Sequence, residues 1–229
     1  SMIRRNIALI PAAGVGARFG AGKPKQYVEI NGKTVLQHTI EIFEQHPRID
    51  LIAVILSPED SVFQTALSEK VRVFRVGGAS RAETVRNGVS TLLEQGLAEA
   101  QDNILVHDAA RCCLPAEALT RLLDEAEESN EGGILAIPVA DTLKRADGSH
   151  HIDETVARAG LWQAQTPQLF QTALLNRALS VDDLSEITDE ASAVEKLGIR
   201  PRLVQGDTRN LKLTLPQDEY IVRLLLKAV

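Results

Sequence analysis

Three cations lie close together in a glycine-rich segment near the N-terminus. Residues 11–26 read Pro-Ala-Ala-Gly-Val-Gly-Ala-Arg-Phe-Gly-Ala-Gly-Lys-Pro-Lys-Gln, and the cations are Arg18, Lys23 and Lys25. Small residues let a backbone approach a ligand closely, and successive backbone N–H groups can hold phosphate oxygens. The segment therefore predicts a loop that binds a polyphosphate and neutralises its charge; the alternative is a surface loop with solvated charges.

This segment matches neither of two widespread phosphate-binding motifs. A dinucleotide-binding fingerprint requires Gly-x-Gly-x-x-Gly, and although Gly14 and Gly16 fit, Phe19 occupies the place of the third glycine. A P-loop requires a glycine and a Ser or Thr at the positions where this chain has Ala17 and Pro24. The loop must therefore belong to another class of phosphate-binding site.

A second polar group follows the strand-like segment at residues 103–107, whose centre is apolar. Asp108 comes directly after this segment, and Arg111 lies three residues further on. Ligands of parallel α/β sheets bind outside the carboxyl ends of the strands. We therefore expect Asp108 to lie at the same edge as the glycine-rich loop, although an aspartate here could equally cap a turn or helix.

Strand-like and helix-like segments alternate along the first part of the chain and position these residues. Short apolar runs predict buried strands, and apolar residues at helical spacing predict helices. The predicted strands are 6–10, 51–56, 71–76, 103–107 and 133–139, and the predicted helices are 35–44, 61–67, 81–94 and 115–128. Such alternation with short connections is typical of an α/β fold, with a parallel sheet and helices on both faces.

The alternation stops at residues 141–161, which hold few apolar side chains. Asp147-Gly148 is a turn signal between 142–145 and 151–156, so the segment predicts a polar β-hairpin. An isolated hairpin is marginally stable in water, and we therefore expect this arm to pack on a partner or to cover an active site. Beyond it we expect a helix at 188–197, strands at 202–205 and 211–214, and a helix at 216–226.

The composition excludes several classes of protein. The chain has 229 residues and a formal net charge of −6, whereas a general nucleic-acid binder is usually basic. The longest apolar run, 51–56, is far shorter than a bilayer span, so we expect no membrane association. The two cysteines, Cys112 and Cys113, are adjacent, and we expect reduced thiols in a cytoplasmic protein rather than a disulfide or a zinc site.

The glycine-rich segment resembles the signature loop of nucleotidyltransferases that join a nucleoside triphosphate to a phosphorylated sugar or polyol. More specifically, the chain resembles the 2-C-methyl-D-erythritol 4-phosphate cytidylyltransferase family of the non-mevalonate isoprenoid pathway. Besides residues 11–26, the motifs that carry this resemblance are 106–111, 141–145, 165–168, 188–192 and 210–214, in the family's order. The resemblance implies one Rossmann-like nucleotidyltransferase domain over 1–229, with a mainly parallel twisted sheet, helices on both faces and 141–161 as a protruding β-hairpin arm.

The reaction implied by the resemblance joins CTP to a polyol phosphate and releases pyrophosphate. Attack of one phosphate on another requires charge neutralisation and in-line geometry rather than a nucleophilic side chain. By resemblance, Arg18, Lys25 and Lys212 are the catalytic cations. The resemblance also implies Mg²⁺ as cofactor, with Asp108 as its protein ligand, since Mg²⁺ commonly combines a carboxylate with triphosphate oxygens.

The remaining roles implied by the resemblance are binding roles. The nucleotide-binding residues are Pro11, Ala12, Ala13, Gly14, Gly16, Lys25, Gly78, Thr84, Asp108 and Ala109, and the polyol-phosphate-binding residues are Thr142, Arg158, Thr166, Thr188 and Lys212. The family often has an acidic residue after its paired glycines, where this chain has Ala79. Backbone groups must then contribute more to recognition of the base.

The partners implied by the resemblance are CTP, a polyol phosphate and a second copy of the chain. The family implies a homodimer in which each 141–161 arm reaches the neighbouring site. Two alternative functions stay open from the sequence: a cytidylyltransferase for another polyol phosphate, such as ribitol 5-phosphate, and a nucleotide-binding module without catalysis.

Overall fold

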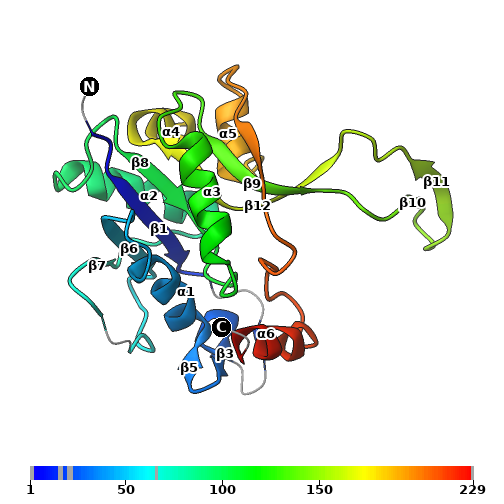
Figure 1. Cartoon of the computed structure of the whole chain (residues 1–229), viewed down its shortest axis with the longest axis horizontal. Coiled ribbons are helices and arrows are strands. Elements are labelled where there is room, and N and C mark those ends of the chain that lie inside the picture. The colour runs from blue at the N-terminus through cyan, green and yellow to red at the C-terminus, as the bar shows by residue number, and fades with distance from the viewer. Residues whose placement is uncertain (1–2, 15–17, 20–22, 65–66, 228–229) are drawn as a thin grey trace.

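A seven-stranded sheet runs through the centre of the chain (Figure 1). The computed structural model describes residues 3–14, 18–19, 23–64 and 67–227, and for residues 18 and 19 it describes the backbone only. In sheet order, the strands are β13 (Arg202–Gln205), β9 (Gly133–Pro138), β12 (Trp162–Gln171), β8 (Asn103–Val106), β1 (Asn6–Ala12), β6 (Leu51–Leu56) and β7 (Val71–Phe74). The sheet is mainly parallel, and β12 runs antiparallel to both of its neighbours.

The central strands are continuous apolar runs because both faces of the sheet are covered by helices. All six residues of β6 are buried, and Ile7 of β1 lies in register with Leu51 of β6 and Ile104 of β8. Alternate residues of β1 point to opposite sides: Ile10 belongs to one buried cluster and Leu9 to another. The sheet therefore separates two hydrophobic cores.

Each core is completed by helices that present an apolar face. Helices α1 (Val35–Glu44) and α3 (Ala116–Ala126) cover one face, through residues such as Phe43 and Leu122. Helices α2 (Arg81–Glu94), α4 (Thr172–Leu179) and α5 (Glu190–Glu195) cover the other, through residues such as Val89 and Leu179. Helices on both faces of a mainly parallel sheet confirm the expected fold class.

Several short elements lie beside the carboxyl edge of the sheet, and some of them enclose a third hydrophobic cluster. The short elements are β2 (Arg18–Phe19), β3 (Lys23–Pro24), the 3₁₀ turn Lys25–Tyr27, β4 (Glu29–Ile30), β5 (Lys33–Thr34) and α6 (Asp218–Lys227). Ile30, Leu213 and Val222 pack together in this cluster with Ala110 and Cys112. The C-terminal segment therefore returns to the region that follows β8, where Asp108 lies.

The predicted hairpin is present and extends away from the rest of the chain (Figure 1). Strand β10 (Leu143–Ala146) pairs antiparallel with β11 (Ile152–Val156), and the side chains of both are largely exposed. Asp147 organises the turn, because its carboxylate accepts hydrogen bonds from the backbone N–H groups of Ser149 and His151. The arm is thus a locally ordered hairpin without an apolar core of its own.

Two predicted segments are wrong. The described part of 61–67 is not helical, because the Asp60 carboxylate accepts the backbone N–H groups of Val62 and Phe63 and holds a turn. Residues 211–214 are not a strand; the N–H of Leu213 donates instead to the carbonyl of Ala110.

Strand β12, helix α4 and the short strands β2, β3, β4 and β5 were not predicted from the sequence, and the helix predicted at 188–197 starts later than expected. The middle of β12 is polar yet buried, so hydrophobic periodicity gave no signal for it. Helix α5 begins after Asp189, which is its N-cap, and not at Thr188. None of the helices within the described ranges is long and apolar enough to cross a membrane.

Candidate active site

A cavity of about 380 Å³ opens at the carboxyl edge of the sheet. It lies where β1, β6 and β8 end, which is where ligands of such sheets bind. Its lining includes nine of the ten predicted nucleotide-binding residues: Pro11, Ala12, Ala13, Gly14, Lys25, Gly78, Thr84, Asp108 and Ala109. The tenth, Gly16, lies outside the described residues, as does the side chain of Arg18.

One wall of the cavity is a backbone loop at the start of α2. A Cβ atom on Gly77 would lie 2.3 Å from the Cβ of Ala13 and 2.8 Å from the carbonyl oxygen of Leu56, so only glycine fits this close approach. The Gly78 N–H donates to the Thr84 hydroxyl at 3.0 Å. The loop is therefore fixed against the end of β1, and the Thr84 hydroxyl, which is buried, serves to orient the Gly78 backbone.

The position of Ala79 is supported by a carboxylate from the first turn of α2. The Ala79 N–H donates to Glu83 at 3.3 Å, while Ser80 caps the helix by accepting the Glu83 N–H. A carboxylate thus lies beside the loop even though residue 79 itself is not acidic. Glu83 was not predicted as a site residue, because the acidic residue of the family pattern is expected directly after the paired glycines and Glu83 lies five residues beyond Gly78.

Lys25 lies on another wall and is close to a second cation. Burial lowers the pKa of the Lys25 ammonium, and the positive charge of Lys212 lowers it further, whereas the Asp108 carboxylate opposes the shift. The neighbouring Gln26 side chain donates to the carbonyl of Gly14 at 3.1 Å and thereby holds the turn beside the glycine-rich loop. Two ammonium groups held close together in one cavity favour a polyanionic ligand.

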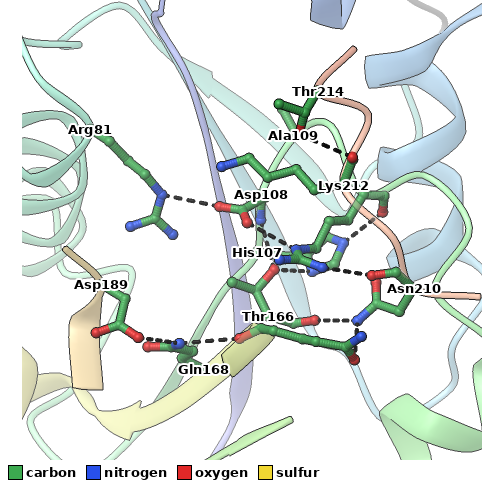
Figure 2. Close-up of polar contacts among 12 residues, drawn as sticks. Arg81, His107, Asp108, Ala109, Thr166, Gln168, Asp189, Asn210, Lys212 and Thr214 are labelled. Atoms are coloured by element: carbon green, nitrogen blue, oxygen red, sulfur yellow. Dashed lines mark hydrogen bonds and ion pairs between the residues drawn. The ribbon is translucent and has the colours of Figure 1, made fainter. Parts of the chain in front are cut away.

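The Asp108 carboxylate lies between two arginines, and Figure 2 shows its contact with one of them, Arg81. One oxygen is 3.1 Å from the Nε of Arg81, and the other is 3.0 Å from the Nε of Arg111. Burial alone would raise the pKa of Asp108, but the charges of Arg81, Lys212 and Arg111 outweigh burial and hold this pKa well below its usual range. Asp108 is therefore a fixed anion on the cavity wall.

A chain of hydrogen bonds lies beneath Asp108 (Figure 2). The Asp108 N–H donates to the Thr166 hydroxyl at 3.0 Å, and that hydroxyl lies 2.8 Å from the Nδ1 of His107. The Nε2 of His107 lies 2.8 Å from the Arg111 carbonyl, which can only accept, so Nε2 carries the proton and Nδ1 accepts from Thr166. Burial lowers the pKa of His107 to about 4, which keeps this ring neutral.

Lys212 is positioned by its neighbours in the chain. The Arg111 guanidinium donates to the Asn210 carbonyl at 2.6 Å, and the Asn210 amide donates to the Thr166 carbonyl at 2.7 Å. Leu213 is fully buried, so the alternation of this extended segment directs Lys212 toward the cavity that it lines. The predicted placement of Lys212 opposite its apolar flanks is confirmed, although the segment is not a strand.

The predicted polyol-binding residues other than Lys212 do not line this cavity. Thr142 and Arg158 are exposed at the open end of the hairpin, where the register Leu143↔Val156 places their segments side by side. Thr188 is exposed just before α5. Thr166 is buried with its hydroxyl bonded to His107 and Asp108, which gives it a positioning role, and its contact with a polyol stays a prediction.

Sequence reasoning missed one prominent interaction beside the cavity. Both terminal nitrogens of Arg81 bind the carboxylate of Glu190, at 2.6 and 3.0 Å, and the Glu190 side chain is fully buried. The two residues are 109 positions apart in the chain, so no local pattern connects them. The available signal was the presence of Glu190 within the 188–192 motif. It is easily overlooked, because an acidic residue at a helix start is ordinarily explained by the helix dipole.

A cavity lined by small residues and cations, at the carboxyl edge of this Rossmann-like α/β sheet, is the arrangement expected of a nucleotidyltransferase. The model of the 2-C-methyl-D-erythritol 4-phosphate cytidylyltransferase family matches residues 6–228. The chain belongs to this family.

Individual relatives agree with the family match. A 2-C-methyl-D-erythritol 4-phosphate cytidylyltransferase of Neisseria meningitidis serogroup C is 70% identical, over all of both chains. One from Chromobacterium violaceum is 50% identical over 97% of this chain and 98% of its own. A crystal structure of 4-diphosphocytidyl-2C-methyl-D-erythritol synthase superposes with a TM-score of 0.85 at 62% identity, covering 97% of this chain and 99% of that one.

We predict that the neutral His107 makes the fold sensitive to mild acid. The folded pKa of about 4 lies below the usual 6.5, so the unfolded chain binds the extra proton between these values. The free energy of unfolding should be fully retained above about pH 6.5 and fall by up to about 1.4 kcal/mol per pH unit as the pH drops toward 4. Urea unfolding at several pH values measures this slope.

The control for this prediction is His107→Gln, whose amide can still donate to the Arg111 carbonyl. This variant should lose the part of the pH dependence that His107 contributes. Equal slopes for the two proteins between pH 5 and 6.5 would contradict the assignment of a buried neutral ring.

Proposed function

We propose that this chain transfers the cytidylyl group of CTP to 2-C-methyl-D-erythritol 4-phosphate, giving 4-diphosphocytidyl-2-C-methyl-D-erythritol and pyrophosphate. The observation that carries the proposal is the cavity in which Lys25, Lys212 and Asp108 face a wall of small residues, in a chain of this family. The pyrimidine would lie against Ala13 and the Gly78 loop, where space is limited and backbone groups are exposed to the ligand. The ribose would lie near Asp108.

In the proposed reaction, a phosphate oxygen of the polyol phosphate attacks the α-phosphorus of CTP. The bond from the α-phosphorus to the bridging oxygen breaks, and pyrophosphate leaves with that oxygen. Lys25 and Lys212 would bind the phosphate oxygens and offset the charge that develops there, and we assign Arg18 the same role by family resemblance. The chain would therefore act by positioning and charge neutralisation.

We propose Mg²⁺ as the cofactor. No group of three or more His, Cys, Asp or Glu side chains that could hold a metal occurs among the described residues. An ion taking most of its ligands from triphosphate oxygens and water, with Asp108 as the protein carboxylate, is compatible with this composition. The low pKa of Asp108 supports the assignment, because the carboxylate stays ionised. When bound, Mg²⁺ would withdraw charge from the triphosphate.

We also propose that the chain forms a homodimer through its 141–161 arms. The arm extends from the body, and it exposes Ile152, of which 66% is accessible (Figure 1). Thr142 and Arg158 lie on it, outside the cavity of their own chain. A two-fold contact would cover the arms and bring both residues to the neighbouring cavity. The cytoplasmic location expected from the sequence stays a prediction.

We predict that pyrophosphate release is specific for one pair of substrates. Four nucleoside triphosphates are each combined with 2-C-methyl-D-erythritol 4-phosphate, ribitol 5-phosphate or no acceptor, with Mg²⁺ or with EDTA. Turnover should be fastest with CTP, 2-C-methyl-D-erythritol 4-phosphate and Mg²⁺, and EDTA should abolish it. Faster turnover with ribitol 5-phosphate would replace the proposed acceptor, and no release with any pair would leave a nucleotide-binding module.

We predict that Lys25→Ala lowers kcat by about 10²–10³-fold, because it removes a donor that acts most strongly on the transition state. The KM for CTP should change less. Lys33→Ala is the matched control: Lys33 forms an ion pair with Glu41 outside the cavity, and its removal should leave kcat unchanged. A Lys25→Ala enzyme with the kcat of the control would refute the assignment.

We predict that Arg158 is needed by the partner's site. A Lys25→Ala chain and an Arg158→Ala chain should each be impaired alone. Their mixed dimer would contain one site with both residues intact, so refolding the two chains together should restore part of the activity. Sedimentation and differently tagged chains establish that mixed dimers form. Mixed dimers without restored activity would show that Arg158 serves its own chain.

A further inference from the structure

Glu190 is buried more deeply than a helix start requires. Its side chain has no exposed surface, and it is the first residue of α5, whose N-cap is already supplied by Asp189. Removing a carboxylate from water is costly unless a cation and hydrogen bonds replace the water. Here the replacement is the Arg81 guanidinium, which donates to both oxygens at 2.6 and 3.0 Å. The pair needs an explanation beyond capping.

The Arg81 guanidinium binds two carboxylates at once. Its terminal nitrogens face Glu190, and its Nε faces Asp108 at 3.1 Å (Figure 2 shows the Asp108 contact). A guanidinium is planar, so fixing its two terminal nitrogens on one carboxylate also fixes the direction of its Nε–H. Glu190 therefore determines where Arg81 meets the Asp108 carboxylate, although Glu190 does not line the cavity.

The start of α5 is held in place independently of this pair. The Gln168 side chain donates to the Asp189 carboxylate at 3.0 Å, as Figure 2 shows. It also donates to the Gln165 carbonyl at 3.1 Å, and its oxygen accepts the Ala191 N–H at 2.9 Å. These contacts attach α5 to β12, which also supports Asp108 through Thr166. Glu190 thus projects from a fixed point.

The two ends of the ion pair belong to segments with different proposed ligands. Arg81 follows directly after the Gly77–Ser80 loop that forms the wall proposed for the pyrimidine. Glu190 follows Thr188, the predicted polyol-phosphate contact, by two residues. A shift of either segment would move the Arg81–Glu190 pair and hence Asp108.

We propose that Glu190 is a positioning residue for nucleotide binding, which acts through Arg81 to orient the Asp108 carboxylate and couples the α5 segment to the CTP site. This inference rests on the proposed function for the identity of the nucleotide. It requires Glu190 and Arg81 to affect CTP affinity as one unit. Residues that merely stabilise the fold would instead affect the free energy of unfolding and leave the affinity of the folded protein unchanged.

The test is a double-mutant cycle on CTP binding, measured by calorimetry without the polyol phosphate. Glu190→Gln removes the charge that holds Arg81, and Arg81→Lys keeps a cation that cannot contact both carboxylates with the same geometry. Each variant should weaken CTP binding on the order of tenfold. The double variant should be no weaker than the worse single variant, because the second change removes an interaction already lost.

Two further variants keep the test decisive. Glu186→Gln is the matched control. Glu186 precedes α5 in the same segment, but it is exposed, and within the described chain its carboxylate contacts only Lys196. The Glu186→Gln protein should bind CTP normally. Should Glu190→Gln fail to fold, Glu190→Asp retains the buried charge and withdraws it by one methylene, and it should weaken CTP binding in a folded protein.

The outcomes separate this inference from the proposed function. Non-additive losses of CTP affinity, with steady-state KM for CTP rising more than kcat falls, support the positioning role. Normal CTP affinity in folded Glu190 variants, or losses that multiply in the double variant, overturn it. Wild-type turnover of CTP with the polyol phosphate would stand in either case, whereas failure of wild-type turnover would overturn the proposed function itself.

Discussion

The site depends on one carboxylate that is held between two arginines. Asp108 accepts from Arg81 on one oxygen and from Arg111 on the other, and each arginine extends the contact to a different part of the chain. Arg111 reaches the Asn210 carbonyl, next to Lys212, and Arg81 reaches Glu190 at the start of α5. Because Asp108 is nearly enclosed, its charge is tolerated only while these partners stay in place. Segments far apart in sequence are therefore fixed relative to one another by a single anion.

The sequence was informative where local pattern decides structure. The apolar run 51–56 and the helical spacing of 35–44 and 81–94 predicted β6, α1 and α2 with their observed bounds. Strand β12 was missed because buried Gln165 and Gln168 are stabilised by side-chain hydrogen bonds, which hydrophobic periodicity does not register.

The residues of the site divide in the same way, into those that local motifs identify and those that only the folded structure brings together. The predicted nucleotide-binding residues that line the cavity belong to short motifs, such as 11–14 at the end of β1, and were found from those motifs, whereas other lining residues such as Glu59 and Arg81 were not predicted. Residues that act through others were not found, since the contact of Arg81 with Glu190 joins α2 to α5 and no spacing along the chain encodes it. Thr166 shows the intermediate case: its motif drew attention to it, and only the structure shows its hydroxyl facing His107.

The charge arrangement explains why an acidic protein can hold a polyanion. The chain carries a net charge of −6, but the cavity places Lys25 beside Lys212, and the charge of the nearby Asp108 carboxylate is offset by two arginines. Burial and the charge of Lys212 lower the pKa of Lys25, which means that the two ammonium groups repel one another before an anion enters. A triphosphate between them would replace this repulsion with two attractions in a partly desolvated site. The affinity for an anion therefore arises from local geometry, and the overall charge of the chain opposes it only through a distant and screened field.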